Sequence, residues 1–446
     1  MPYFQMLFKF LKYLQPTSYF NLKINKHLVF PDSTLLPKDV MAKLEMDASF
    51  KSVLATNLDL SWQAIQHGYI GDSETIQLRG KIPLEDEYRF VRKYFNPIWA
   101  SYCLVIRILS FKNPLKEFNA WLQARNTIRR KMAYGVFEQK EWFSFESELL
   151  KNNPKISVII PTLNRYGFLE KVLQDFELQD YKNFEIIIVD QSDHFNADFY
   201  KQFNLEIQLI QQEEKALWLA RNTAIKHATG NIIALSEDDV RIQPGWLTAH
   251  LKCLDFYKAD ISAGVFYPEG KTVPKERSFF AVAKQFATGN AMLYKNVFKK
   301  VGLFDRQFEK GRMGDGEFGL RCYLAGCKSI SNPYANCIDV KANTGGLREQ
   351  GSWDAYRPTN WFAPRPIPTV LYYYRKYFGN KLAILELMKS VPPSMIPYKF
   401  KRNKKMLILG LGISIFLFPL IVFQVTRSWQ LASVKLKQGA LIDELY

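Results

Sequence analysis

Residues 230–240 read GNIIALSEDDV, an apolar run that ends in three consecutive acids, Glu237, Asp238 and Asp239. Burying several carboxylates beside a core strand is costly unless a cation pairs with them. Hard divalent cations prefer carboxylate oxygen and keep positions open for phosphate oxygens of a substrate. The stretch therefore predicts a metal site at the end of a strand, with an inert, solvated acidic turn as the alternative.

Strands and helices alternate around this stretch. Runs of β-branched residues predict buried strands, and Pro161 is expected to end the first of them. Apolar residues at helical spacing predict helices between these strands. Such alternation is typical of an open α/β sheet, which binds ligands at the carboxyl ends of its strands. Asp190 and the acids at 237–239 both fall at such ends. The expected elements are strands at 156–160, 185–189 and 207–210 and helices at 168–176 and 216–228.

Four short motifs occur in order along this part of the chain. The motifs are VIIPTLNR at 158–165, IVDQS at 188–192, ARNTAI at 220–225 and SEDDV at 236–240. With them, the sequence resembles the family 2 glycosyltransferases of the GT-A fold, of the type that builds bacterial surface polysaccharides. The resemblance covers residues 155 to about 350 and implies an α/β nucleotide-sugar-binding domain.

The resemblance implies a pocket for the diphosphate of a nucleotide sugar. Pro161, Thr162 and Arg165 would line it, with the Arg165 guanidinium pairing with phosphate. Arg221 would face the diphosphate or hold the acidic loop, and the alternative for it is an ordinary surface arginine on a helix.

The resemblance also places the base and the sugar of the donor. Asp190 would accept hydrogen bonds from a uracil or guanine edge or from the ribose. Gln191 stands where the family often has a second acid, which leaves UDP and GDP both open. Gly289 and Asn290 would border the sugar pocket, although an ordinary turn before a strand explains this pair equally well.

The family's Asp-X-Asp metal motif corresponds to Glu237–Asp239 here. Asp239 would be the direct ligand of Mg or Mn, Asp238 would lie near the ribose or the metal, and Glu237 would reach the metal directly or through water. Asp339 stands where related enzymes often carry a metal-binding histidine, so we expect a third metal contact or a plain strand-end acid. Residues 345–348 would form a loop that closes over the diphosphate.

A second acidic signature follows at 314–321, GDGEFGLR. The family's pattern places the catalytic base at Asp315, with Gly314 in place of an acid that usually precedes it. Glu317 would be a second acid near the donor and a substitute base. The alternative is that Asp315 only caps a helix at 316–325.

The remaining segments give a domain organisation. Residues 1–150 are expected to form an accessory α+β region of unknown role, with a strand at 75–84 and a basic helix at 114–133. The region 351–400 is expected to be helical, and either interfacial or packed on the catalytic domain. A basic flank precedes the apolar run 406–425, which is expected to span or re-enter a membrane. The domains are therefore 1–150, 151–350, 351–400 and 401–446.

Composition limits the function. The chain of 446 residues has a formal net charge of +17 and five cysteines, of which we expect Cys322 and Cys327 to be buried thiols, and we expect a reducing compartment. Neither cysteine nor histidine spacing suggests zinc, and no nucleic-acid-binding motif accompanies the positive charge. The resemblance implies an inverting, metal-dependent hexosyltransferase, and the basic flank before the apolar run places it at the cytoplasmic face of the bacterial inner membrane. Its donor would be a UDP- or GDP-sugar and its acceptor a glycan or polyprenyl-linked glycan. The alternative is a catalytically inactive membrane scaffold with the same fold.

Overall fold

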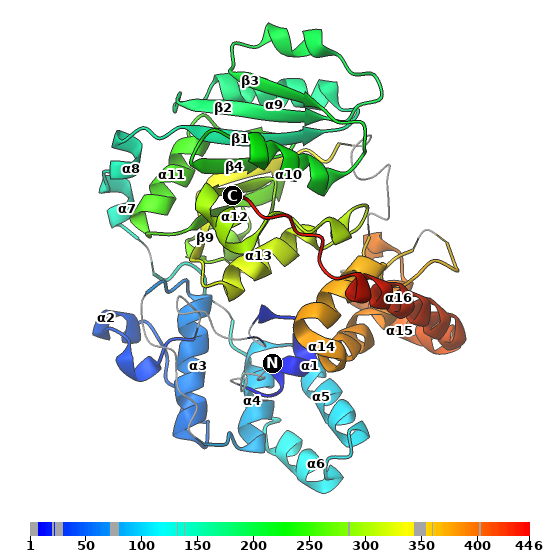
Figure 1. Cartoon of the computed structure of the whole chain (residues 1–446). Coiled ribbons are helices and arrows are strands. Elements are labelled where there is room, and N and C mark those ends of the chain that lie inside the picture. The colour runs from blue at the N-terminus through cyan, green and yellow to red at the C-terminus, as the bar shows by residue number, and fades with distance from the viewer. Residues whose placement is uncertain are drawn as a thin grey trace. The chain divides into compact units, whose positions relative to one another are not determined.

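The structure is a computed structural model of the whole chain (Figure 1). It describes residues 8–19, 22, 30–71, 80–131, 133–137, 139–283, 286–342, 354–358, 360–400 and 403–446. The chain forms two compact units. The first comprises residues 1–137 and 374–414, and the second comprises residues 138–373 and 415–446. Each is described separately below.

The second unit is built on a nine-stranded mixed sheet in the order β3-β2-β1-β4-β8-β6-β9-β5, with β7 pairing with β9. Its first half is parallel, and three of its four strands are buried along their whole length because they are runs of β-branched and apolar residues. These parallel strands are β1 (Ile156–Thr162), β2 (Phe184–Asp190), β3 (Ile207–Gln211) and β4 (Ile232–Ser236).

These four strands confirm the expected parallel core. The one difference is at Pro161, which was expected to end the first strand but pairs with Val189 inside β1. A proline lacks only its own N–H, and near the end of a strand this loss is tolerated.

The other half of the sheet reverses direction. β8 runs antiparallel to β4 and to β6, β9 runs parallel to β6, and β5 pairs antiparallel with β9. The chain therefore passes from β4 to the far edge of the sheet within a few residues of the acidic stretch. The strands are β5 (Val240–Ile242), β6 (Ile261–Pro268), β7 (Ala281–Val282), β8 (Asn290–Tyr294) and β9 (Ser329–Asp339).

Helices cover this sheet (Figure 1). Those that follow β1 and β3 have buried apolar faces, and α11 contacts both β6 and β9. Two short N-terminal helices precede the sheet, and Ser147 Oγ in this segment donates to Asp255 Oδ2 at 2.7 Å. The helices are α7 (Glu141–Ser144), α8 (Glu148–Lys151), α9 (Tyr166–Glu177), α10 (Leu217–His227), α11 (Trp246–Phe256), α12 (Lys295–Val301) and α13 (Gly314–Leu324).

The C-terminal residues belong to this unit. Helix α16 (Phe418–Gln438) buries Ser428 and Ala432, and the tail beyond it is held by a hydrogen bond from Leu441 N to Asp305 Oδ1 at 2.9 Å. Helix α14 (Pro368–Ser390) begins in this unit, where Tyr372 is buried and donates to Asp305 Oδ2 at 3.0 Å. The aromatic start of α14 is therefore packed on the catalytic domain, which is the second of the two alternatives given for this region.

The apolar run 406–425 is divided between two helices. Helix α15 (Lys404–Phe416) and α16 meet at a bend of 87°. Among the described residues, no single helix is long and apolar enough to cross a membrane, and this bent pair meets the requirement only when both members are taken together. In the described part of the chain, the predicted membrane segment is therefore a bent pair of helices.

The first unit is helical in its described part. The predicted basic helix ends at Gln123, ten residues earlier than expected. Of the strand predicted at 75–84, residues 75–79 lie outside the described residues, and the described residues 80–84 form no strand and lead into α4 (Leu84–Tyr94). The described residues before β1 contain helices and no strand of a sheet, so the expected β component of this region has no counterpart among them. The helices are α1 (Leu11–Leu14), α2 (Lys38–Met41), α3 (Val53–Gln66), α4 (Leu84–Tyr94), α5 (Ile98–Leu109) and α6 (Pro114–Gln123).

Candidate active site

The predicted site residues converge at the carboxyl ends of the parallel strands. Thr162 ends β1 opposite Asp190, which ends β2, and β4 ends beside them at Ser236. The acids that follow β4 turn back over this edge, where Thr162 Oγ1 donates to Asp238 Oδ2 at 2.8 Å. The order of the strands thus brings residues together that are about eighty positions apart, as the alternating pattern predicts.

Arg165 lies between two of the acids. Its Nη1 atom is 2.9 Å from Asp238 Oδ1 and 3.2 Å from Asp239 Oδ2. Burial raises the pKa of Asp238, and Arg165 opposes that rise. In this structure the guanidinium neutralises the acidic stretch from within the pocket that was predicted to receive a diphosphate.

Asp239 is also held by the far edge of the sheet. Its backbone oxygen accepts from Val340 N at 3.2 Å, and its Oδ2 atom accepts from Ala342 N at 3.2 Å. Asp339 pairs with Val240, so its backbone lies next to that of Asp239. The expected loop at 345–348 lies outside the described residues.

Arg221 is a fully buried cation beside the same acids. Its Nη2 atom is 3.6 Å from Glu237 Oε1 and its Nη1 atom donates to Ser236 O at 3.4 Å. Within the described part of the chain, its Nε and Nη2 atoms have no hydrogen-bond partner. Burial lowers the pKa of Arg221 to about 10, so the side chain is still charged at neutral pH. Its position is not that of an ordinary surface arginine.

Glu237 is crowded by like charges. Enclosure by protein atoms raises its pKa to about 7, and Asp239, Asp238 and Asp315 add to the rise while Arg221 opposes it. Because 41% of the side chain is exposed, water screens part of this effect. A Cβ atom on Gly289 would lie 2.5 Å from Glu237 Cδ, so a larger residue there would displace the Glu237 side chain.

Asp190 is fully buried and accepts three hydrogen bonds. They come from Tyr166 Oη at 2.6 Å, Tyr200 Oη at 2.7 Å and Ser192 N at 2.9 Å. The neighbouring Gln191 accepts from Ala216 N at 2.7 Å. The two tyrosines were not predicted. The sequence could have suggested only Tyr166, because it begins the helix that follows β1. Tyr200 could not have been predicted, because its contact with Asp190 depends on how the segment after β2 folds.

Asn290 is the centre of a buried polar network. Its Oδ1 atom accepts from Trp246 Nε1 at 3.0 Å and lies 3.0 Å from His250 Nε2, and its Nδ2 atom donates to Ala335 O at 3.0 Å. Burial lowers the pKa of His250 to about 3, so the ring is neutral. The side chain of Asn290 links helix α11 to strand β9. Of the pair Gly289 and Asn290, it is Gly289 that lies against an acid of the site, Glu237.

Asp315 lies in the first turn of α13, and its Oδ1 atom accepts from Gly316 N at 2.7 Å. The N-cap position is occupied by Met313, with φ of 81°, rather than by Asp315. Burial raises the pKa of Asp315, while Arg312 and Arg221 oppose the rise. Gly314 packs against Trp218, where a Cβ atom would clash with the indole ring, which explains why no acid stands there.

Glu317 is occupied elsewhere. Its carboxylate is fully buried and pairs with Arg321 Nε at 3.0 Å, and Arg321 also donates to the Leu303 carbonyl at 2.8 Å. This ion pair ties α13 to the loop after α12. The geometry therefore favours Asp315 over Glu317 as the carboxylate available to a substrate.

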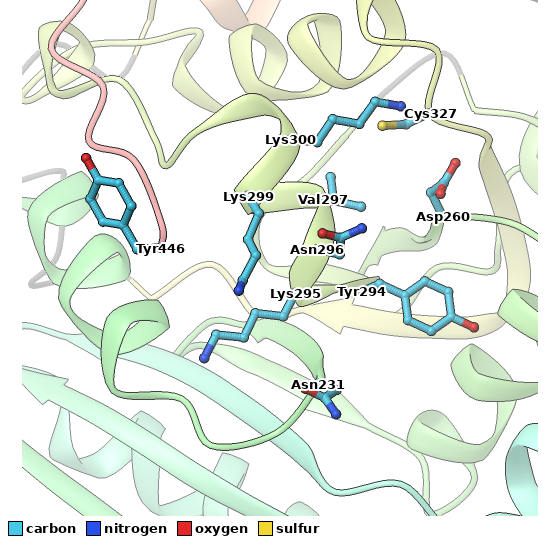
Figure 2. Close-up of a pocket in the computed structure, with 10 residues that line it drawn as sticks. All are labelled: Asn231, Asp260, Tyr294, Lys295, Asn296, Val297, Lys299, Lys300, Cys327 and Tyr446. Carbon is cyan, nitrogen blue, oxygen red and sulfur yellow. The ribbon is translucent and has the colours of Figure 1, made fainter.

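Two further observations bear on ligands. Among the described residues, no three His, Cys, Asp or Glu side chains are arranged as a ready set of metal ligands. A cavity of about 580 Å³ lies elsewhere, around the start of α12 (Figure 2), and contains none of the predicted site residues. All five cysteines are buried free thiols, which confirms the expectation for Cys322 and Cys327.

Comparisons with known proteins match the segment that carries these site residues. Residues 157–305 match the sequence model of the family described as Glycosyl transferase family 2. The glycosyltransferase GlyA of Streptococcus pneumoniae is 30% identical over 163 residues, which are 36% of this chain and 22% of that protein. AglE of Haloferax volcanii is 30% identical over 165 residues, 34% of this chain and 53% of that protein.

A third relative has a more specific name. The GalNAc(5)-diNAcBac-PP-undecaprenol beta-1,3-glucosyltransferase of Campylobacter jejuni is 25% identical over 179 residues, 36% of this chain and 57% of that protein. This chain thus covers little more than half, or less, of these relatives. Among solved structures, TarS 1–349 of S. aureus in complex with UDP-GlcNAc has 17% identity and a TM-score of 0.43, over 62% of this chain and 83% of that one.

Proposed function

We propose that residues 157–305, which match the sequence model of the family described as Glycosyl transferase family 2, form a glycosyltransferase domain of that family. On that premise, this protein transfers a sugar from a nucleotide-diphosphate sugar to a hydroxyl group of a glycan, with inversion. The donor would be of the UDP or GDP type. The scaffold alternative is not favoured, because the carboxylates and arginines that the chemistry needs occur together at one edge of the sheet.

The observation that carries this proposal is the state of Arg221. Among the described residues, two nitrogen atoms of this fully buried guanidinium lack a hydrogen-bond partner, and its ion pair with Glu237 is long at 3.6 Å, an arrangement that costs free energy unless a ligand supplies acceptors. A diphosphate supplies the acceptor oxygens that those donors lack. Arg165, held in the same pocket by Asp238 and Asp239, would provide the second cation.

The acidic stretch suits a divalent metal in chemistry, although it is not arranged as a ligand set here. Asp239 and Glu237 offer hard oxygen donors, and burial together with the neighbouring carboxylates raises the pKa of Glu237, a cost that a cation would relieve. We assign these two residues to Mg or Mn, with Asp339 as an outer contact because its backbone adjoins that of Asp239. When bound, such an ion would neutralise charge on the departing diphosphate.

Asp315 is the proposed base. Its carboxylate lies near Arg221 and Glu237, since it influences the pKa of both. It would take the proton from the acceptor hydroxyl as the oxygen attacks the anomeric carbon from the face opposite the diphosphate. A single displacement of this kind inverts the configuration and requires no nucleophilic side chain.

We further propose a polyprenyl-linked glycan as acceptor, in surface polysaccharide synthesis at the cytoplasmic face of the bacterial inner membrane. The undecaprenol in the name of the Campylobacter relative supports this acceptor class. The strongly basic chain, with a net charge of +17, suits an anionic membrane surface.

A panel of UDP- and GDP-sugars tests the function. With Mn present, at least one donor should raise the melting temperature of the protein and be hydrolysed slowly without acceptor. Arg221→Met should lose the thermal shift, whereas Arg306→Met, at a partly exposed arginine of the same unit, should keep it. Absence of both binding and hydrolysis across the panel would refute a glycosyltransferase role.

A further inference from the structure

Helices α5 and α6 form a hairpin whose tip is apolar and exposed. The two helices pack against each other and against α4 in the first unit. At the tip Phe111 is 99% exposed, and Leu109 and Leu115 beside it are 67% and 82% exposed. A soluble helical hairpin normally places polar residues at such a turn.

Helix α5 is apolar on both of its faces. Its inner face is buried in the core of the first unit through Ala100, Cys103 and Ile106. Its outer face carries Ile98, 65% exposed, and Val105, also exposed. A helix that is apolar all round belongs inside a core or against lipid, and only one face of α5 has a protein core.

The tip is rigidly presented. Arg107 in α5 pairs with Glu117 in α6 through Nε–Oε2 at 2.8 Å, and Tyr88 Oη donates to the same Oε2 atom at 2.8 Å. The turn is closed by Phe111 N bonding to Ile108 O at 3.0 Å and Lys112 N to Arg107 O at 3.1 Å. These bonds fix Phe111 in its outward position, so its exposure is a built feature of the hairpin.

The charge around this apolar surface has one sign. Residues 97–131 contain seven Lys and Arg and a single acid, Glu117. That acid is buried and neutralised by Arg107. The outer surface is therefore apolar and cationic, with exposed Lys112 next to Phe111 in the sequence and exposed Lys116 next to Leu115. Anionic lipid headgroups complement this combination better than a neutral protein surface does.

The dimensions indicate insertion into one leaflet. Helix α5 has 12 residues and a length of about 18 Å, whereas the hydrocarbon core of a bilayer is about 30 Å thick. The hairpin is too short to cross, but its tip can place two or three apolar side chains below the headgroups.

We propose that the α5–α6 hairpin is a membrane-docking element, with Phe111, Leu109 and Leu115 entering the interface of an anionic bilayer while Lys112 and Lys116 meet the headgroups. This inference gives residues 1–150 a role. It rests on the proposed function only in expecting the enzyme to work at a membrane. It does not involve the C-terminal apolar segment at 406–425.

Vesicle binding by the full-length protein tests the proposal. F111S/L115S should bind vesicles containing phosphatidylglycerol at least about tenfold more weakly, since two large apolar side chains no longer leave water. L35S/M46S, which removes two exposed apolar side chains elsewhere in the same unit, should bind like the wild type. K112Q/K116Q should weaken binding to anionic vesicles and leave the weaker binding to phosphatidylcholine unchanged.

A label at the tip of the hairpin tests its insertion directly, even if other segments of the protein also bind vesicles. The native cysteines are all buried, so F111C can be labelled with a polarity-sensitive dye, with L35C as its control. The emission at position 111 should shift to the blue on anionic vesicles, and that at position 35 should not. Equal responses, unchanged binding of F111S/L115S, or a loss of self-association in that variant without loss of vesicle binding would each overturn the proposal.

Donor hydrolysis in solution separates this inference from the proposed function. F111S/L115S should hydrolyse the donor at the wild-type rate because the hairpin is not part of the active site. If the wild-type protein bound vesicles through the hairpin but hydrolysed no donor, the function would fail and the docking element would stand.

Discussion

At the carboxyl end of β4, three adjacent carboxylates face two arginines in very different settings. Arg165 is paired with Asp238 and Asp239. The buried Arg221, by contrast, has two nitrogen atoms, Nε and Nη2, without a hydrogen-bond partner among the described residues. The motif spacing predicted that these groups meet, because it depends only on where parallel strands end. It did not predict their pairing, which depends on side-chain positions across the sheet.

Asp239→Asn should reduce transfer by at least about a hundredfold, because it removes charge from the proposed metal ligand. The fold should survive, since Ala342 N can still donate to an amide oxygen. Asp443→Asn is a matched control, as its surface ion pair with Lys226 is remote from the chemistry. Undiminished turnover of Asp239→Asn in a steady-state assay would remove the acidic stretch from the mechanism.

Asp315→Asn should lower kcat by roughly a hundredfold while leaving donor affinity nearly constant, because a base acts on the acceptor proton and not on the diphosphate. The raised pKa of Asp315 adds a pH signature. A base must be deprotonated, so kcat should fall as the pH drops through that raised pKa, at a higher pH than for an ordinary aspartate.

Glu317→Gln should behave differently from Asp315→Asn. It leaves the buried Arg321 without its charge partner, and breaking a buried pair costs about 3–5 kcal/mol. We expect a lower melting temperature with kcat largely kept in the folded fraction. Loss of kcat at an unchanged melting temperature would move the base from Asp315 to Glu317.

At the scale of elements, the parallel strands and their helices could be predicted because their signals are local. The antiparallel strands β6, β8 and β9 could not, since their order depends on contacts between distant segments. Asn290 shows the difference most clearly. Its sequence context indicated a sugar pocket, but the folded sheet surrounds its side chain with Trp246, His250 and Ala335.

The buried His250 predicts how this network responds to acid. Its folded-state pKa of about 3 lies below the ordinary value near 6.5. Below pH ~6.5 the unfolded chain takes up a proton that the folded chain refuses, so the free energy of unfolding should fall as the pH drops from ~6.5 toward 3. The slope from this one group is about 1.4 kcal/mol per pH unit. Denaturant titrations of the wild type and His250→Gln should differ in that slope, and identical slopes would contradict the assignment.

At the scale of the whole molecule, the C-terminal segment is the main difference from the sequence expectation. The apolar run was expected to form an anchor separate from the catalytic domain. Instead, α16 and the tail pack on that domain, where Leu441 N bonds to Asp305 and Lys435 Nζ donates to Gln307 O at 2.8 Å. Helical periodicity alone could not reveal this packing, because an apolar helix has the same sequence signal in a core and in lipid.

Deleting residues 415–446 should therefore destabilise the catalytic unit as well as remove apolar surface. The deletion exposes the partners of Ser428 and Ala432 and leaves Asp305 without Leu441. We expect the melting temperature to fall by several degrees or more. A deletion of 440–446 alone should have a smaller effect of the same sign, and an unchanged melting temperature in both would show that the segment does not belong to this unit.

The central claim is that the pocket of Arg221, Arg165 and the acids at 237–239 binds a nucleotide-diphosphate sugar. Isothermal titration of the full-length protein with UDP- and GDP-sugars in the presence of Mn tests it most directly, with Arg221→Met and Asp239→Asn as variants. We predict saturable binding of one donor class by the wild type and a loss of at least about tenfold in affinity in Arg221→Met, the cost of one charge-assisted contact. Equal affinity of Arg221→Met and wild type, or no binding of any donor, would contradict it.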